Sequence, residues 1–129
     1  MRKMNLIAAL FLVLMVVSNS PKASDKTPAN EPIPMPENVK AIIDKSCFGC
    51  HNTDSRNEDA KEELDFKMLG DLSLVKKIGA LNHIGEVVEE NKMPPKKFLE
   101  RYPDRKLSDE ETKILTDWVK KEAAALIKQ

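Results

Sequence analysis

The feature that most constrains this chain is a five-residue motif in which Cys47 and Cys50 flank two residues and His51 follows directly. The chain of 129 residues has only two cysteines, and both lie in this motif. Two thiols at this spacing with an adjacent histidine are typical of c-type haem attachment, where the thiols form thioethers and the histidine binds the iron. The sequence therefore predicts one covalent haem c on Cys47 and Cys50, with His51 as the proximal iron ligand.

Three other uses of the cysteine pair fit less well. A structural disulfide between Cys47 and Cys50 stays open. A thioredoxin-like redox pair occurs in a βαβ setting, and the sequence shows no pattern for one. A tetrahedral zinc site needs four ligands, for which Cys47, Cys50, His51 and His83 are the available set. Because Cys50 and His51 are neighbours, they would chelate one metal ion poorly, and haem remains the favoured interpretation.

The N-terminus has the pattern of an export signal. Arg2 and Lys3 precede an unbroken apolar run over 6–17, and small or polar residues follow at 18–20. A membrane-spanning helix needs roughly 20 apolar residues, so a secretory signal fits better than an anchor. We therefore predict a signal peptide over 1–20 and a location in the periplasm or at the exterior of the cell envelope. An uncleaved leader is the alternative, and it is the one predicted route to membrane contact.

The rest of the chain divides into a linker and one folded domain. Five of the eight prolines lie in residues 21–36, and proline cannot propagate a helix because it lacks the backbone N–H. We predict a Pro-rich linker over 21–36 and a folded domain over 37–129. Aromatic residues make up only 5% of the chain, so a bound haem would add apolar surface that few side chains provide.

Helical patterns fill this domain, and no pattern long enough for a strand occurs. An apolar stripe follows Pro36, a weaker pattern covers 57–69, and a clear helical period covers 73–91. Ser108 and Glu111 form a capping box that starts a last helix. We therefore predict an all-α bundle of about four helices. The residues expected on its apolar faces are Val39, Ile42 and Ile43, then Leu74, Ile78, Leu81, Gly85 and Val88, then Ile114, Leu115, Trp118, Val119 and Leu126.

The sixth iron ligand must come from another segment. The candidates beyond the leader are Met35, Met68, Met93 and His83, with lysine as a remote option. Met93 follows a predicted helix end and precedes Pro94 and Pro95, so a stiff loop would hold its thioether in place. We interpret Met68 as a packing residue on a helix and His83 as a half-exposed surface residue. The sequence therefore favours Met93 as the distal ligand and leaves His83 as the main alternative.

Four features follow one another along the chain: the cysteine motif, Leu64-Asp65-Phe66, Met93-Pro94-Pro95, and a helix start at 107–111 that leads to Trp118. In this order they resemble the bacterial haem-binding-domain family of monohaem c-type cytochromes over roughly 39–119. The resemblance implies a compact fold like that of class I cytochromes c, wrapped around the haem, with His51 and Met93 as axial ligands. Where family members often carry a stretch with proline and tryptophan after the haem motif, this chain has a polar run over 52–63.

These expectations lead to a function. Histidine and methionine together close the iron to other ligands, which favours electron transfer over catalysis. We predict a one-electron carrier that is not an enzyme, because the chain is also too short for a separate catalytic domain. Basic residues around Met93 indicate a redox partner protein with an acidic surface, while a net charge of zero gives no reason to expect nucleic acid. The alternative is a haem-based sensor or ligand-binding module with an open or displaceable sixth position.

Overall fold

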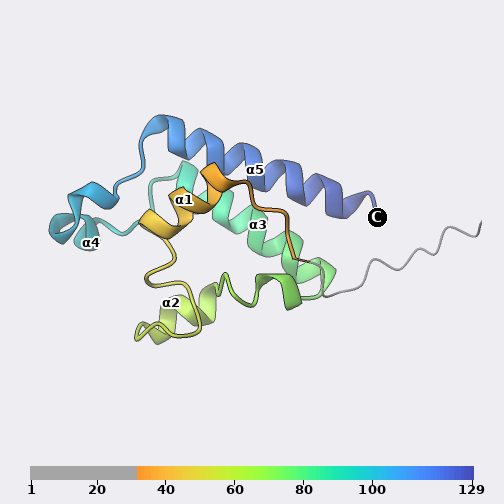
Figure 1. Cartoon of the computed structure of the whole chain (residues 1–129), viewed down its shortest axis with the longest axis horizontal. Coiled ribbons are helices and arrows are strands. Elements are labelled where there is room, and N and C mark those ends of the chain that lie inside the picture. Colours follow the sequence, from red (N-terminus) through yellow and green to blue (C-terminus); the bar gives the residue numbers. More distant parts are fainter. Residues whose placement is uncertain (1–31) are drawn as a thin grey trace, which may run out of the picture.

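Five α-helices and two short 3₁₀-helices occur within residues 32–129, the part of the chain that the computed structural model describes (Figure 1). No strand is found in this range, in agreement with the predicted all-α class. The predicted signal peptide at 1–20 and the linker up to residue 31 lie outside the described residues. Among the described helices, none combines the length and hydropathy that a membrane span requires.

Three helices form the core: α1 (Glu37–Ser46), α3 (Leu74–Glu89) and α5 (Asp109–Ile127). α3 and α5 lie side by side and share the most extensive interface, and α1 packs against α5 (Figure 1). Burial of apolar side chains between these helices is the main source of stability. The core consists of Val39, Ile42 and Ile43 from α1, Leu81, Ile84 and Val88 from α3, and Leu115, Trp118, Val119 and Ala123 from α5.

The helix starts follow local signals in the sequence. α1 begins directly after Pro36, whose fixed φ suits the entry to a helix. At the start of α5, the Ser108 hydroxyl accepts a hydrogen bond from the Glu111 N–H at 3.1 Å, and the Glu111 carboxylate accepts one from the Ser108 N–H at 2.9 Å. The predicted capping box is therefore confirmed.

The predicted helix over 73–91 is confirmed as α3, but its buried face differs from the prediction. Leu81, Gly85 and Val88 are buried as expected, whereas Leu74 is exposed and Lys77 is buried in its place. The buried face of α3 therefore begins at Lys77 and not at Leu74. Gly85 is needed for the close contact with α5, because a Cβ there would lie 3.2 Å from Cγ2 of Val119.

Two short helices lie outside this core, α2 (Glu58–Glu63) and α4 (Lys96–Arg101), and neither contains a buried residue. α2 is shorter than the predicted helix over 57–69. It ends because Leu64 is extended, and the chain continues through turns into the 3₁₀-helix η1 (Leu69–Asp71). α4 was not predicted, so the described residues hold one α-helix more than the expected four. It is followed by the 3₁₀-helix η2 (Pro103–Arg105).

Residues 32–36, at the end of the predicted linker, run along the core without forming a helix. The indole N–H of Trp118 donates a hydrogen bond to the Pro34 carbonyl at 2.8 Å. Ile33 and Met35 pack against the core cluster, so Met35 is a packing residue. Trp118 itself is only 4% exposed, which confirms its predicted place on the apolar face of the last helix.

Candidate functional site

The cysteine motif forms a tight turn directly after α1. The N–H groups of Cys47 and Phe48 both donate to the Ile43 carbonyl at 2.8 Å. The N–H groups of Cys50 and His51 then donate to the Cys47 carbonyl at 3.1 Å. The structure thus brings the three predicted haem-binding residues of the motif together within one turn, anchored on the last turn of a core helix.

Both cysteines are free thiols, so the structure contains no disulfide between them. Burial, with a smaller contribution from neighbouring Cys50, raises the pKa of the Cys47 thiol to about 12. Within residues 32–129, no three side chains of histidine, cysteine, aspartate or glutamate come together as a metal-ion site would require. The zinc alternative therefore finds no support in this part of the chain.

The His51 ring is oriented by two backbone carbonyls. Its Nδ1 lies 2.7 Å from the Ala60 carbonyl oxygen and 3.2 Å from the Leu64 carbonyl oxygen. A carbonyl oxygen only accepts hydrogen bonds, so Nδ1 carries a proton, and in the neutral ring Nε2 is the nitrogen that holds the lone pair. Metal-ligating histidines are commonly oriented in this way by a bond from the other ring nitrogen. The end of α2 therefore fixes both the tautomer and the direction of the predicted ligand.

Further contacts brace the motif on its C-terminal side. The Phe66 N–H donates to the His51 carbonyl at 3.1 Å, and the Phe66 ring lies edge-on to the imidazole with centroids 6.5 Å apart. The buried Asn52 side chain donates to the Phe48 carbonyl and accepts a bond from the Asp54 N–H at 2.9 Å. His51 is therefore contacted by Phe66 and by the carbonyls of Ala60 and Leu64, while Asn52 braces the turn of the motif at Phe48. None of these contacts was predicted.

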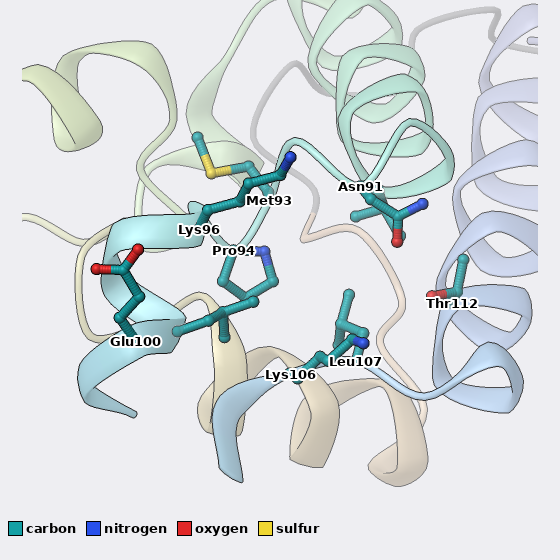
Figure 2. A pocket seen from close by; sticks show the side chains of 10 residues that line it. Asn91, Met93, Pro94, Lys96, Glu100, Lys106, Leu107 and Thr112 are labelled. Atoms are coloured by element: carbon teal, nitrogen blue, oxygen red, sulfur yellow. The ribbon is translucent and has the colours of Figure 1, made fainter. Parts of the chain in front are cut away.

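Met93 lies on a separate segment, directly after α3. The N–H groups of Lys92 and Met93 both donate to the Val87 carbonyl, at 2.8 and 3.1 Å, and the Pro94 side chain that follows is buried. The methionine is thus held in a well-anchored loop, as predicted from the two prolines. Figure 2 shows its sulfur turned away from the ring of Pro94 and from Leu107.

A hollow of about 510 Å³ lies on the other side of this loop (Figure 2). None of the three motif residues contributes to its wall, so it is separate from the cysteine motif. Both apolar and charged side chains line it. The lining residues are Val88, Asn91, Met93, Pro94, Lys96, Leu99, Glu100, Lys106, Leu107 and Thr112.

Of the three other candidates for a distal ligand, Met35 packs against the core, and His83 and Met68 lie on exposed surface. His83 is on α3 with its side chain 58% exposed, and its Nδ1 is 3.7 Å from a carboxylate oxygen of Glu86. This matches its interpretation as a surface residue. Met68 is 47% exposed at the start of η1, so its interpretation as a packing residue on a helix is wrong. The reason is the early end of α2, which leaves Met68 in a turn.

Comparison with known proteins gives one match. A family model described as a haem-binding domain matches residues 54–121, which is just over half of the chain. The matched range contains Met93 and begins after His51, so the cysteine motif itself lies outside it. No curated protein and no solved structure matches the chain.

Proposed function

Since the chain belongs to the haem-binding domain family, we propose that it carries one covalent haem c and works as a one-electron carrier. A bound haem would supply reversible one-electron chemistry at its iron. In this proposal Cys47 and Cys50 form the two thioethers, His51 is the proximal iron ligand and Met93 is the distal one. The chain's own residues then have three tasks: to attach the group, to orient its ligands and to exclude competing ligands.

The state of His51 is the observation that carries the proposal. Its Nδ1 donates to the carbonyls of Ala60 and Leu64, so Nε2 is the ring nitrogen left to bind iron. Two free thiols lie on the same turn, at the spacing that thioether attachment requires. The donor set of one imidazole and two thiols therefore fits a c-type haem, and the family match independently supports haem.

Met93 supports electron transfer over ligand binding or catalysis. A thioether and an imidazole together raise the reduction potential and leave the iron no open position. The Val87 carbonyl and the buried Pro94 restrict the backbone of Met93, so the side chain is presented from a firm base. His83 offers no comparable support, because it is exposed on α3. We therefore infer a carrier that is not itself an enzyme.

The setting and partner are also part of the proposal. The predicted signal peptide supports the periplasm or the exterior of the cell envelope. Lys96, Lys97 and Arg101 are exposed on α4, close to Met93 in sequence, and within residues 32–129 their side chains form no ion pair. Glu100 is the acidic residue of α4, so the helix keeps a net positive charge, and such charge steers a negatively charged protein toward the surface that carries it. We propose a redox partner protein with an acidic docking surface.

The proposed ligation is tested by substituting alanine for Met93 in protein made with a working cytochrome c maturation system. We expect the wild-type protein to retain haem under denaturing conditions, to show the weak red absorption band of methionine-ligated ferric haem, and to exclude CO when reduced. Met93→Ala should keep the haem, lose that band and bind CO, because only the distal ligand is removed.

Met68→Ala is the matched control, since it removes an exposed methionine elsewhere in the chain and should leave the spectrum unchanged. An unchanged spectrum in Met93→Ala would exclude Met93 as the ligand. Ready CO binding by the wild-type protein would instead favour a sensor or ligand-binding module. Absence of covalent haem from the wild-type protein would contradict the proposal as a whole.

A further inference from the structure

Two hydrogen bonds run in opposite directions between the end of α1 and the segment that leads into α5. The hydroxyl of the buried Ser46 donates to the Arg105 carbonyl at 2.8 Å, and the Arg105 guanidinium donates to the Lys45 carbonyl at 2.6 Å. The last carbonyls of a helix have no partner within it, so Arg105 satisfies one of them from outside. We call Ser46 and Arg105, with these two bonds, the reciprocal clamp.

Lys45 reinforces the same junction. Its ammonium group lies 2.5 Å from a carboxylate oxygen of Glu111 and 3.4 Å from the Lys106 carbonyl oxygen. Hydrogen bonds between charged groups are about twice as strong as neutral ones. The two residues directly before Cys47 are therefore tied both to the segment around Arg105 and to the first turn of α5.

The clamped segment begins at Met93. Residues 93–107, which we call the strap, contain the loop after α3, the helix α4 and the 3₁₀-helix η2. Within the strap, the Tyr102 N–H donates to the Phe98 carbonyl and the Arg105 N–H to the Tyr102 carbonyl, both at 3.0 Å, so its middle is internally bonded. The first residue of the strap is bonded to the Val87 carbonyl on α3, and Arg105 near its other end is bonded to α1.

We propose that Ser46 and Arg105 are positioning residues that hold the strap against the end of α1 and thereby fix Met93 relative to the cysteine motif. The inference rests on the proposed role of Met93 as an axial ligand. A methionine side chain has several rotatable bonds, so its backbone must be placed firmly if its sulfur is to occupy one position. Loss of the clamp should leave the haem attached, because Cys47 and Cys50 hold it covalently, but should weaken the hold of Met93 on the iron.

The test uses haem-bearing Arg105→Ala and Ser46→Ala, titrated in the ferric state with imidazole, which competes with the thioether for iron. We expect displacement of Met93 at roughly tenfold lower imidazole concentration in Arg105→Ala, the factor that loss of one charged hydrogen bond implies. Ser46→Ala, which loses a neutral bond, should show a smaller shift in the same direction. The double variant should shift by less than the product of the two, because the two bonds join the same two segments and the loss of one already weakens the other.

Hydrogen exchange at the Met93 amide is a second measurement that does not involve the iron, and it should become severalfold faster in both variants. Arg56→Ala and Ser73→Ala are matched controls, because both side chains are exposed, lie outside the strap, and take part in no hydrogen bond between side chain and backbone within residues 32–129. They should behave like the wild-type protein in both measurements.

The possible results separate the clamp from the proposed function. If the wild-type spectrum shows methionine ligation and both clamp variants release Met93 no more readily than the controls, the proposal is overturned. If the wild-type spectrum shows no methionine ligation, the proposed function fails in that respect, and the role of Ser46 and Arg105 in fixing Met93 at the iron fails with it. Faster exchange at the Met93 amide would then show only that the strap is held by the clamp.

Discussion

At the scale of single residues, the orientation of His51 depends on main-chain atoms. The carbonyls of Ala60 and Leu64 accept from its Nδ1, and a carbonyl is present whatever side chain a residue carries. The amino-acid sequence therefore contains no direct signal for this contact, which depends on where α2 ends. The prediction of His51 as a ligand rests on the motif alone, whereas the hydrogen bonds of its Nδ1 could be found only from the fold.

Glu111 allows a prediction of how stability depends on pH. Its hydrogen bond from Lys45 is the main reason that the pKa of this carboxyl lies below its ordinary value. A carboxyl whose pKa is lower in the folded than in the unfolded protein stabilises the fold above its unfolded pKa, and that contribution is lost as the pH falls through the folded pKa. Glu111→Gln should therefore be less stable than the wild-type protein at neutral pH, by up to about 1 kcal/mol, and nearly equal to it in acid.

The measurement is urea unfolding followed by circular dichroism over a range of pH. Glutamine can still accept the hydrogen bond from the Ser108 N–H, so the capping box is kept and only the charge is removed. Asp117→Asn is the control, since its ion pair with Lys113 is exposed. If the free energies of unfolding of Glu111→Gln and the wild-type protein differed by the same amount at neutral and acidic pH, the Lys45–Glu111 ion pair would not be the cause of that difference.

At the scale of secondary-structure elements, two glycines of α3 lie in opposite surroundings. A Cβ at Gly79 would meet no atom within 4 Å, whereas one at Gly85 would lie 3.2 Å from Val119. Gly79→Ala should raise the free energy of unfolding by roughly 0.5–1 kcal/mol, since alanine has the higher helix propensity. Gly85→Ala gains the same propensity but crowds the contact between α3 and α5, so it should be less stable than Gly79→Ala by about 1 kcal/mol or more.

Chemical denaturation of the two variants beside the wild-type protein checks this order. Because both substitutions lie in the same helix and have the same effect on propensity, the difference between them isolates the packing term. If the free energy of unfolding rose equally in the two variants, α3 and α5 would be able to move apart at Gly85 without loss of contacts.

The elements also show which local signals predict structure. α5 was predicted from Ser108 because a capping box lies within four consecutive residues, and α3 from its long apolar period. α2 ended early because Leu64 is extended, where its carbonyl reaches His51 thirteen residues before it in the sequence. α4 was not predicted because Pro94 and Pro95 indicated a stiff loop, although proline is also common at the start of a helix.

At the scale of the whole molecule, the residues proposed to bind haem lie at the edge of the core. The buried side chains come mainly from α1, α3 and α5, whereas α2 and α4 contribute none. Yet α2 orients His51, and α4 belongs to the segment that begins at Met93. The proposed site residues could be predicted from the cysteine motif and from the prolines after Met93. Their arrangement could not, because it depends on contacts between segments far apart in the sequence, such as the reciprocal clamp.

The contrast between the core helices and the short helices α2 and α4 predicts which parts of the protein stay stable when the haem cannot attach. Six-residue helices such as α2 and α4 are not stable alone, since isolated helices shorter than roughly 12–15 residues are marginal in water. In a Cys47→Ala/Cys50→Ala variant, we expect the amides of α3 and α5 to remain protected from hydrogen exchange and those of α2 and α4 to exchange much faster than those of α3 and α5. In haem-bearing protein, bonds from the iron to His51 and Met93 would tie these segments to the core, so their protection should rise at least tenfold. Equal protection of α2 and α4 with and without haem would show that the protein alone holds these segments, and that haem binds to a site already fixed.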